Sequence, residues 1–164
     1  EPLAKGNMVV FKGSSIASGK ILAAQGAVQS FLEENDNNKA IYISLSNKSG
    51  SSFMNSITNK SQLSVITSDH SNTNEVEQFL TPIIGLKLIE ELISQGSQNL
   101  LIVLDDVMQH HFMEKAVFEK ANQPFSPVNI INELYQRSGI FDQYEMTTLV
   151  MLDNANVGEQ FLID

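Results

Sequence analysis

The sequence predicts an α/β domain with a mainly parallel sheet that is covered by helices. Short apolar runs alternate along the chain with longer segments in which apolar residues recur every three or four positions. The short runs are uninterrupted, which is typical of parallel strands that are buried on both faces. Strands that alternate with helices favour such a sheet, because each parallel connection needs a crossover segment.

Six strands and five helices are expected. The expected strands, in chain order, are residues 8–11, 40–45, 63–67, 100–104, 148–152 and 159–163, the last as a hairpin or edge partner. The expected helices are residues 21–32, a short helix around Phe53 and Ile57, and residues 75–95, 109–122 and 128–137. Polar loops are expected at 46–50 and 68–74, and Gly85 is a candidate break in the long helix.

The composition is that of one domain over residues 1–164. Hydrophobic residues make up 42% of the chain, and there is no cysteine, which excludes disulfides, thiolate metal sites and cysteine nucleophiles. The net charge of −9 argues against nucleic acid as the main partner, since nucleic acids select basic surfaces. No apolar run approaches the ~18 residues that span a bilayer, so direct membrane insertion is not expected. The start at Glu1 and Pro2 favours a segment of a longer chain.

The stretch 8–21 has the form of a strand, a Gly/Ser loop and the start of a helix. Phosphate-binding loops follow the pattern G-x-x-x-x-G-K-[ST], and the chain keeps its end as Gly19 and Lys20. It has Ser14 in place of the first glycine and lacks the final hydroxyl. The alternative is a tight connection without a ligand. The candidate nucleotide-binding residues are Ser15, Ile16, Ala17, Ser18, Gly19, Lys20 and Ile21.

The most hydrophobic run, 100–104, ends in Asp105 and Asp106. A strand that ends in Asp places a carboxylate at the carboxyl edge of the sheet, where it can hold Mg²⁺ through water. Asp105 is therefore the candidate metal residue, and the alternative is an Asp that caps the following turn. Two expected strands separate Lys20 from Asp105, as in RecA-type ATPase cores.

Taken together, these segments resemble the nucleotide-binding domain of F-type ATP synthase subunits, and the non-catalytic α subunit more than the β subunit. The chain would be a divergent paralogue. The segments that carry the resemblance are residues 8–11, 18–20, 39–48, 101–106 and 158–163, together with Pro124. The double Asp at the end of 101–106 is the α-type feature, because β subunits have a single Asp followed by Asn.

The resemblance implies a RecA-like P-loop core that binds ATP or ADP with Mg²⁺ but has no catalytic residue of its own. Asn47 stands where β subunits have the Glu that orients water, Ile16 where α subunits have Arg, and Ile21 where the loop hydroxyl belongs. The implied partners are catalytic β-type subunits in a hetero-hexamer, in the cytoplasm or an organelle matrix and membrane-peripheral through the complex. The alternative is a pseudo-ATPase interaction module that no longer binds nucleotide.

Three other groupings have weaker functional interpretations. His110 and His111, with Glu114 at helical spacing, suggest a metal site, but adjacent helical histidines face different directions, so a solvated or interfacial pair is expected. Asp69 and His70 lie near serines without a nucleophile elbow. The acidic run 33–36 is expected to be a solvated helix end.

Overall fold

The structure is a computed structural model of the chain. It describes residues 5–13, 19–45, 47–68, 75–105, 107–124 and 130–153, with the backbone alone at residues 47, 48 and 153. The strands are β1 Met8–Gly13, β2 Lys39–Ser44, β3 Leu63–Thr67, β4 Asn99–Leu104, β5 Gly139–Ile140 and β6 Glu145–Asp153. The helices are α1 Lys20–Glu34, α2 Asn47–Ser56, the 3₁₀ turn η2 Lys60–Gln62, α3 Glu75–Ser94, α4 Val107–Lys120 and α5 Ile130–Arg137.

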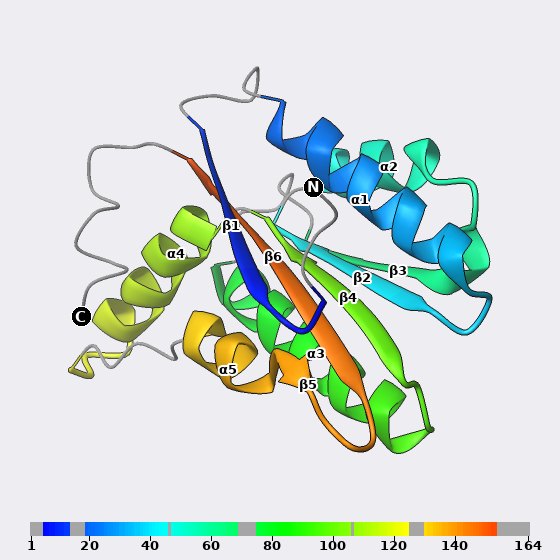
Figure 1. Cartoon of the computed structure of the whole chain (residues 1–164). Helices are drawn as coiled ribbons and strands as arrows, with labels where there is room; N and C mark the ends of the chain where they lie inside the picture. The colour runs from blue at the N-terminus through cyan, green and yellow to red at the C-terminus, as the bar shows by residue number, and fades with distance from the viewer. Residues whose placement is uncertain are drawn as a thin grey trace.

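The described strands form one sheet in the order β1-β6-β4-β2-β3 (Figure 1). Every pair along this path is parallel, and the two-residue β5 adds to β6 in the antiparallel direction. Helices α1 and α2 cover one face, and α3, α4 and α5 cover the other (Figure 1). The predicted α/β fold with a mainly parallel, helix-covered sheet is confirmed. No helix of the described residues is long and apolar enough to cross a membrane.

The alternation of side chains along the strands produces two cores, one on each face of the sheet. In β4, Leu101 and Val103 join the core under α1 and α2, while Leu100, Ile102 and Leu104 join the core under α3, α4 and α5. A strand with two buried faces must be apolar at every position, which is why this run is the most hydrophobic in the sequence. Each such side chain contributes about 1.5–3 kcal/mol through its burial.

Strand β1 departs from the prediction that its apolar run is buried on both faces. Its residues alternate between half-buried and exposed, and Val10 is 40% exposed. The reason is the topology, since β1 is the last strand at its end of the described sheet. An apolar run cannot tell a central strand from a strand at the end of a sheet.

The predicted loop 46–50 is wrong, because Asn47 to Gly50 form the first turn of α2. The glycine in this turn has a packing role. A Cβ at Gly50 would lie 2.3 Å from Cγ2 of Thr67 and 3.1 Å from Cγ1 of Val65, so the glycine lets α2 approach β3. The Ser/Gly content of this stretch predicts a loop, but the segment is helical and its backbone packs closely against β3.

Helix α3 is continuous from Glu75 to Ser94, so Gly85 does not interrupt it, and Pro82 lies within it as well. A Cβ at Gly85 would lie 2.4 Å from Cδ1 of Ile43, which shows that α3 packs against β2 at this point. Pro82 and Gly85 are both buried. Packing against the sheet thus outweighs the low helix propensity of Gly and Pro.

The C-terminal region has one strand that the sequence did not predict. The short strand β5 and β6 form a hairpin, in which the amide of Phe141 donates to the carbonyl of Tyr144 over 2.8 Å and their rings lie 4.8 Å apart. A two-residue strand has no periodicity that a sequence could show. The expected strand 159–163 lies outside the described residues and stays a prediction.

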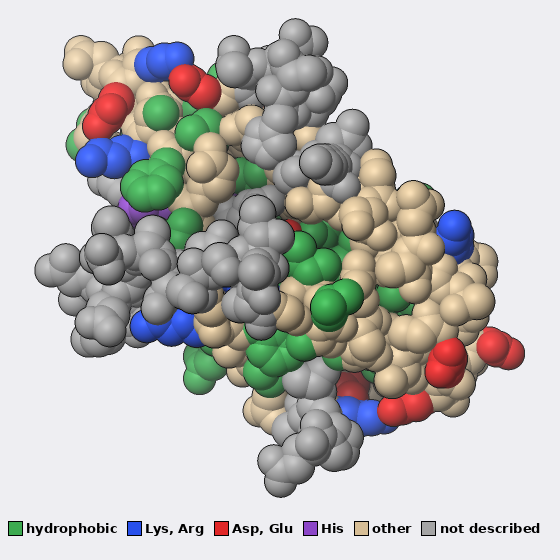
Figure 2. All heavy atoms as spheres, turned by 90° about the horizontal axis from the view of Figure 1, so that it is seen from above, with side chains coloured by type: hydrophobic (Ala, Val, Ile, Leu, Met, Phe, Trp, Pro, Cys, Tyr) green, Lys and Arg blue, Asp and Glu red, His purple; other side chains and the backbone are tan. Residues whose placement is uncertain are grey.

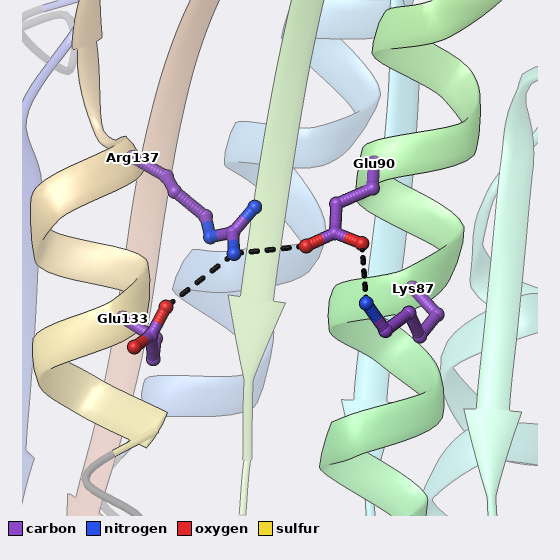
Figure 3. A network of polar contacts seen from close by, with 4 residues as sticks. All are labelled: Lys87, Glu90, Glu133 and Arg137. Atoms are coloured by element: carbon purple, nitrogen blue, oxygen red, sulfur yellow. Dashed lines mark hydrogen bonds and ion pairs between the residues drawn. The ribbon is translucent and has the colours of Figure 1, made fainter.

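A network of charged side chains joins α3 to α5 (Figure 3). Nη2 of Arg137 lies 2.9 Å from Glu90 and 3.4 Å from Glu133, and Nζ of Lys87 lies 2.7 Å from the second oxygen of Glu90. The hydrogen bond from Lys87 holds the pKa of Glu90 below its ordinary value, against a smaller effect of desolvation, and Arg137 lowers it further. The chain's single arginine therefore fixes α5 over the end of α3.

The close contact at Gly50 gives a first testable prediction. Gly50→Ala should lower the free energy of unfolding by about 1–3 kcal/mol, because the added methyl overlaps Thr67. Gly26→Ala, in the middle of α1, is the matched control, since a Cβ there meets nothing within 4 Å. It should stabilise the protein by about 1 kcal/mol through helix propensity. Urea unfolding measures both, and a stabilising Gly50→Ala would contradict the packing.

The Arg137 network predicts a pH-dependent contribution of Glu90 to stability. A carboxyl whose folded pKa is lowered stabilises the fold above its unfolded pKa, and this contribution is lost as the pH falls through the folded pKa. Glu90→Gln should therefore lower the melting temperature at pH 7, and this deficit should shrink below pH 4.5 and disappear once the pH is below the lowered pKa of the folded protein. Glu91→Gln is the control, because the Glu91 carboxylate accepts from the neutral Gln95 side chain. A decrease in the melting temperature of Glu90→Gln that is equal at pH 7 and at a pH below the folded pKa would contradict the prediction.

Candidate functional site

The carboxyl ends of β1, β6 and β4 meet at one edge of the sheet, beside the start of α1 (Figure 1). The register places Gly13 of β1 opposite Asp153 of β6, and Leu104 of β4 opposite Val150 of β6. Ligands of open parallel sheets bind outside the carboxyl ends of the strands. This edge is therefore the place where the predicted loop and the predicted metal residue can act together.

The described part of the candidate loop begins at Gly19. Of the predicted nucleotide-binding residues, Ser15, Ile16, Ala17 and Ser18 lie outside the described residues. Gly19 precedes α1 in the left-handed region with φ 77°, which favours glycine, and a Cβ there would meet nothing within 4 Å. The first amide groups of a helix have no intrahelical acceptor, and Gly19 offers no side chain to cap them. The backbone at the start of α1 is thus able to approach an anion closely.

The ammonium group of Lys20 lies at the ends of two strands. Nζ donates to the carbonyl of Leu152 over 2.9 Å and to the carbonyl of Gly13 over 3.3 Å. One side chain therefore joins β1 to β6 at the edge where the loop begins. A phosphate near α1 would lie within the reach of a charge that is already held at this edge, but it would compete with the two carbonyls for the ammonium group.

Ile21 has no polar role in the structure. Its side chain is half-buried and packs against the core under α1 and α2. A P-loop serine or threonine at this position would contact the metal directly, and an isoleucine cannot. Any metal that accompanies a phosphate here would lack this ligand.

Asp105 lies just beyond β4, on the same face of the sheet as α1. Leu101 and Val103 face α1 and α2, and the two-residue period places Asp105 on their side. Its backbone amide donates to the carbonyl of Ile43 over 2.8 Å, which fixes the turn. Its Oδ2 accepts a hydrogen bond of 2.6 Å from the hydroxyl of Tyr42 on β2. Asp105 is therefore held at the carboxyl edge by two contacts with β2, one through its backbone amide and one through its carboxylate.

The sequence does not single out Tyr42 as a partner of Asp105. Tyr42 lies within an apolar strand and reads as a core residue, and it is in fact fully buried. A tyrosine in one strand only weakly predicts a hydrogen bond to an Asp at the end of another strand. The register of β2 against β4 is needed to show that the Tyr42 hydroxyl reaches Asp105. The tertiary structure was needed to pair them.

The donors at this edge fit a phosphate group better than they fit a metal ion. A positive charge at Lys20, a helix start without an acidic first turn, and a glycine backbone all favour an anion. Asp105 supplies one carboxylate, and the described residues show no group of three or more His, Cys, Asp or Glu side chains that could hold a metal. A magnesium ion would thus depend on the phosphate and on water for most of its ligands.

Figure 2 views the molecule from above, the end at which β1 leads into α1. Hydrophobic side chains reach the surface near the middle of this view, and the charged side chains in sight lie mainly nearer its margins. A pocket of about 470 Å³ lies along α1, lined in part by Gly26, Phe11 and Phe31. Neither Lys20 nor Asp105 lines it, so this pocket is separate from the candidate site.

The histidine pair was predicted to be solvated or interfacial, and His110 is not solvated. His110 is 3% exposed and Glu114 is 2% exposed, so both are buried. The ring of His110 stacks on Phe79 of α3, and Nε2 donates to the Phe79 carbonyl over 3.3 Å. Burial lowers the pKa of His110, against the effect of this hydrogen bond, and favours the neutral ring. The prediction was wrong for His110 because α3 covers that side of α4.

The remaining groupings have simple outcomes. Glu33 and Glu34 are exposed, as predicted, and Glu34 pairs with Lys5 at 3.3 Å. The backbone of Asn47 lies in the first turn of α2. Asp69 and His70 lie outside the described residues, as does Asp106.

The strand-joining role of Lys20 predicts a stability effect that needs no ligand. Lys20→Met should lower the free energy of unfolding by about 1–2 kcal/mol, because two carbonyl groups lose a charged donor. Lys60→Met removes an exposed lysine from η2 and should change stability by less than about 0.5 kcal/mol. Urea unfolding in nucleotide-free buffer measures both. Equal effects of the two substitutions would argue against the joining role.

Comparison with known proteins adds one finding about the fold. No protein-family model matches the chain, and no curated protein matches it in sequence. Among solved structures, the chain is similar to the unique ATP synthase subunit NeqB from Nanoarcheaum equitans, with a TM-score of 0.70 and 18% identity. The match covers 92% of this chain and 40% of NeqB, so the chain spans less than half the length of that subunit. The chain therefore has the fold of a part of an ATP synthase subunit.

Proposed function

We propose that the chain is a non-catalytic nucleotide-binding domain of an F-type-ATPase-like hexameric assembly. Its core would be RecA-like, its ligand ATP or ADP with Mg²⁺, and its partners homologous catalytic β-type subunits that hydrolyse the nucleotide. The role of the domain is then structural or regulatory. Its sister subunits supply the chemistry.

The observation that carries this proposal is the shared position of Lys20 and Asp105. The ammonium group lies at the ends of β1 and β6, and the carboxylate lies beyond β4, the next strand in the sheet. Both belong to the edge at which α1 begins, and Asp105 lies on the α1 face. A cation for phosphate and a carboxylate for a hydrated magnesium ion are the two charges that a P-loop site requires.

The residues also support the absence of catalysis. Hydrolysis needs a group that orients water, and the β-type Glu position holds Asn47, whose amide cannot act as a carboxylate base. Ile21 brings an apolar side chain to the place of the loop hydroxyl. When bound, magnesium would supply charge neutralisation for the phosphates, and Asp105 would contribute to its outer ligands.

The link to an ATP synthase assembly rests on two supports. One is the set of sequence segments that resemble the α subunit, the Asp105 and Asp106 pair above all. The other is the similarity of the fold to NeqB, which is itself an ATP synthase subunit. The order β1-β6-β4-β2-β3 keeps Lys20 and Asp105 one strand apart, with β6 between their strands.

A second candidate function is a pseudo-ATPase interaction module without nucleotide. It is favoured by one observation, namely that Lys20 already makes two hydrogen bonds to strand carbonyls. A lysine with this structural role can be retained after phosphate binding has been lost. The two candidates differ in nucleotide affinity, which can be measured directly.

Calorimetry with ADP and ATP in the presence of Mg²⁺ tests the first candidate. We expect micromolar binding, which corresponds to about −8 kcal/mol. Lys20→Ala should weaken it by roughly 10- to 100-fold, because a hydrogen bond to a charged group contributes about 1.5–3 kcal/mol. Lys60→Ala is the matched control, because Lys60 is exposed and precedes β3, and it should bind like the wild type. Hydrolysis should be absent throughout.

The outcomes separate the candidates. The absence of binding by the wild type at millimolar nucleotide would favour the interaction module, and hydrolysis by the isolated chain would contradict both. Assembly is tested on the full-length protein, which should join a ring when its catalytic partner is co-expressed. A monomer under those conditions would argue against membership of the assembly.

A further inference from the structure

Three residues form a continuous contact from α2 to the candidate site. The ring of Phe53 on α2 stacks on the ring of Tyr42 on β2, with centroids 4.1 Å apart and 18° between the planes. The Tyr42 hydroxyl then donates to Asp105 Oδ2 at the end of β4. Both rings are completely buried, whereas Asp105 is partly exposed at the edge of the sheet.

The Tyr42–Asp105 hydrogen bond has the features of a strong one. Its length of 2.6 Å is in the range of O–H···O⁻ bonds to an ionised carboxylate. The phenol lies in the core, so its hydroxyl has little access to water as an alternative partner. The stacked rings leave the phenol few orientations, because the ring is packed between α2 and the sheet.

We propose that Tyr42 is a positioning residue for a magnesium–nucleotide complex, acting by orienting the Asp105 carboxylate. This inference rests on the proposed function, and it adds a residue that is not part of the loop or of the Asp-terminated strand. Tyr42 touches neither nucleotide nor metal. It fixes one oxygen of the carboxylate toward β2 and so restricts the direction in which the carboxylate can serve hydrated magnesium.

The physical reason is the freedom of an Asp side chain at a strand end. Without a fixed partner, the carboxylate rotates among several rotamers. Metal binding must then restrict this rotation, and the lost conformational entropy lowers the affinity for the metal. Outer-shell partners of metal-binding groups typically change metal affinity by about 10–100-fold when they are removed. Because Asp105 is expected to act through water, we expect the lower end of this range.

The test compares nucleotide affinity with magnesium and with EDTA, measured by calorimetry with ADP. The magnesium ratio is the dissociation constant in EDTA divided by the dissociation constant with magnesium. It reports the contribution of the metal to affinity and cancels effects on the binding of the nucleotide alone. Tyr42→Phe removes only the hydroxyl and should lower this ratio by roughly 10-fold while leaving affinity in EDTA unchanged. Asp105→Asn keeps an acceptor for Tyr42 but removes the charge, and it should lower the ratio at least as much as Tyr42→Phe does.

Tyr135→Phe is the matched control, because Tyr135 is 66% exposed on α5 and should change neither constant. Phe53→Leu provides a second route, since it keeps the Tyr42 hydroxyl and removes the stacked ring. It should lower the magnesium ratio by a smaller factor, and it keeps the inference testable if Tyr42→Phe does not fold. Melting temperatures recorded for each variant identify any general loss of structure.

Each outcome has a distinct meaning. A wild-type magnesium ratio in both Tyr42→Phe and Phe53→Leu, with a lowered ratio in Asp105→Asn, would overturn the role of Tyr42 and leave the proposed function intact. A wild-type protein that binds no ADP would overturn both. A reduced ratio in Tyr42→Phe with unchanged affinity in EDTA would support the inference, because a merely structural defect would weaken both measurements.

Discussion

The parallel pairing of β6 between β1 and β4 is the interaction on which the rest of the described structure depends. Within the described sheet, β6 is the strand that joins β1 to β4. It brings together residues near the two ends of the chain, as in the register of Val10 with Val150. The connection also aligns the carboxyl ends of β1 and β4, and with them Lys20 and Asp105. A site built from these two residues therefore exists only after the most distant strand pairing has formed.

The protein itself provides partners for both charged groups of the candidate site. Strand carbonyls accept from Lys20, and Tyr42 donates to Asp105. The two sets of contacts have different consequences for a ligand. The carbonyls compete with a phosphate for the ammonium group, whereas the phenol orders the carboxylate without opposing a hydrated metal. Both charged groups of the candidate site thus have a structural role in the fold, whether or not a phosphate binds there.

The departures from an active site are explained by packing as well as by chemistry. Ile21 contributes to the core under α1 and α2, so an apolar residue at this position stabilises the fold while it removes a metal ligand. Under the proposed function, partner subunits hydrolyse the nucleotide, and the domain itself does not need this ligand. The similarity to part of NeqB concerns the fold alone, and the role stays a proposal.

The sequence by itself determined the fold class and the described helices and strands other than η2 and β5. Long apolar runs and helical periodicity are local signals, and β3 even has its predicted bounds. It also identified Gly19, Lys20 and Asp105 as candidates, because their types and their order along the chain are visible without coordinates. Residues 14–18 of the loop lie outside the described residues, so their contribution to the site stays a prediction.

Only the tertiary structure decided the features that depend on contacts between distant segments. These are the exposed face of β1, the helical turn at Gly50, the continuity of α3 through Gly85, the burial of His110 and the pairing of Tyr42 with Asp105. The physical reason is common to all of them. Burial, close backbone approach and hydrogen-bond partners are properties of two segments at once, and a linear pattern reports only one.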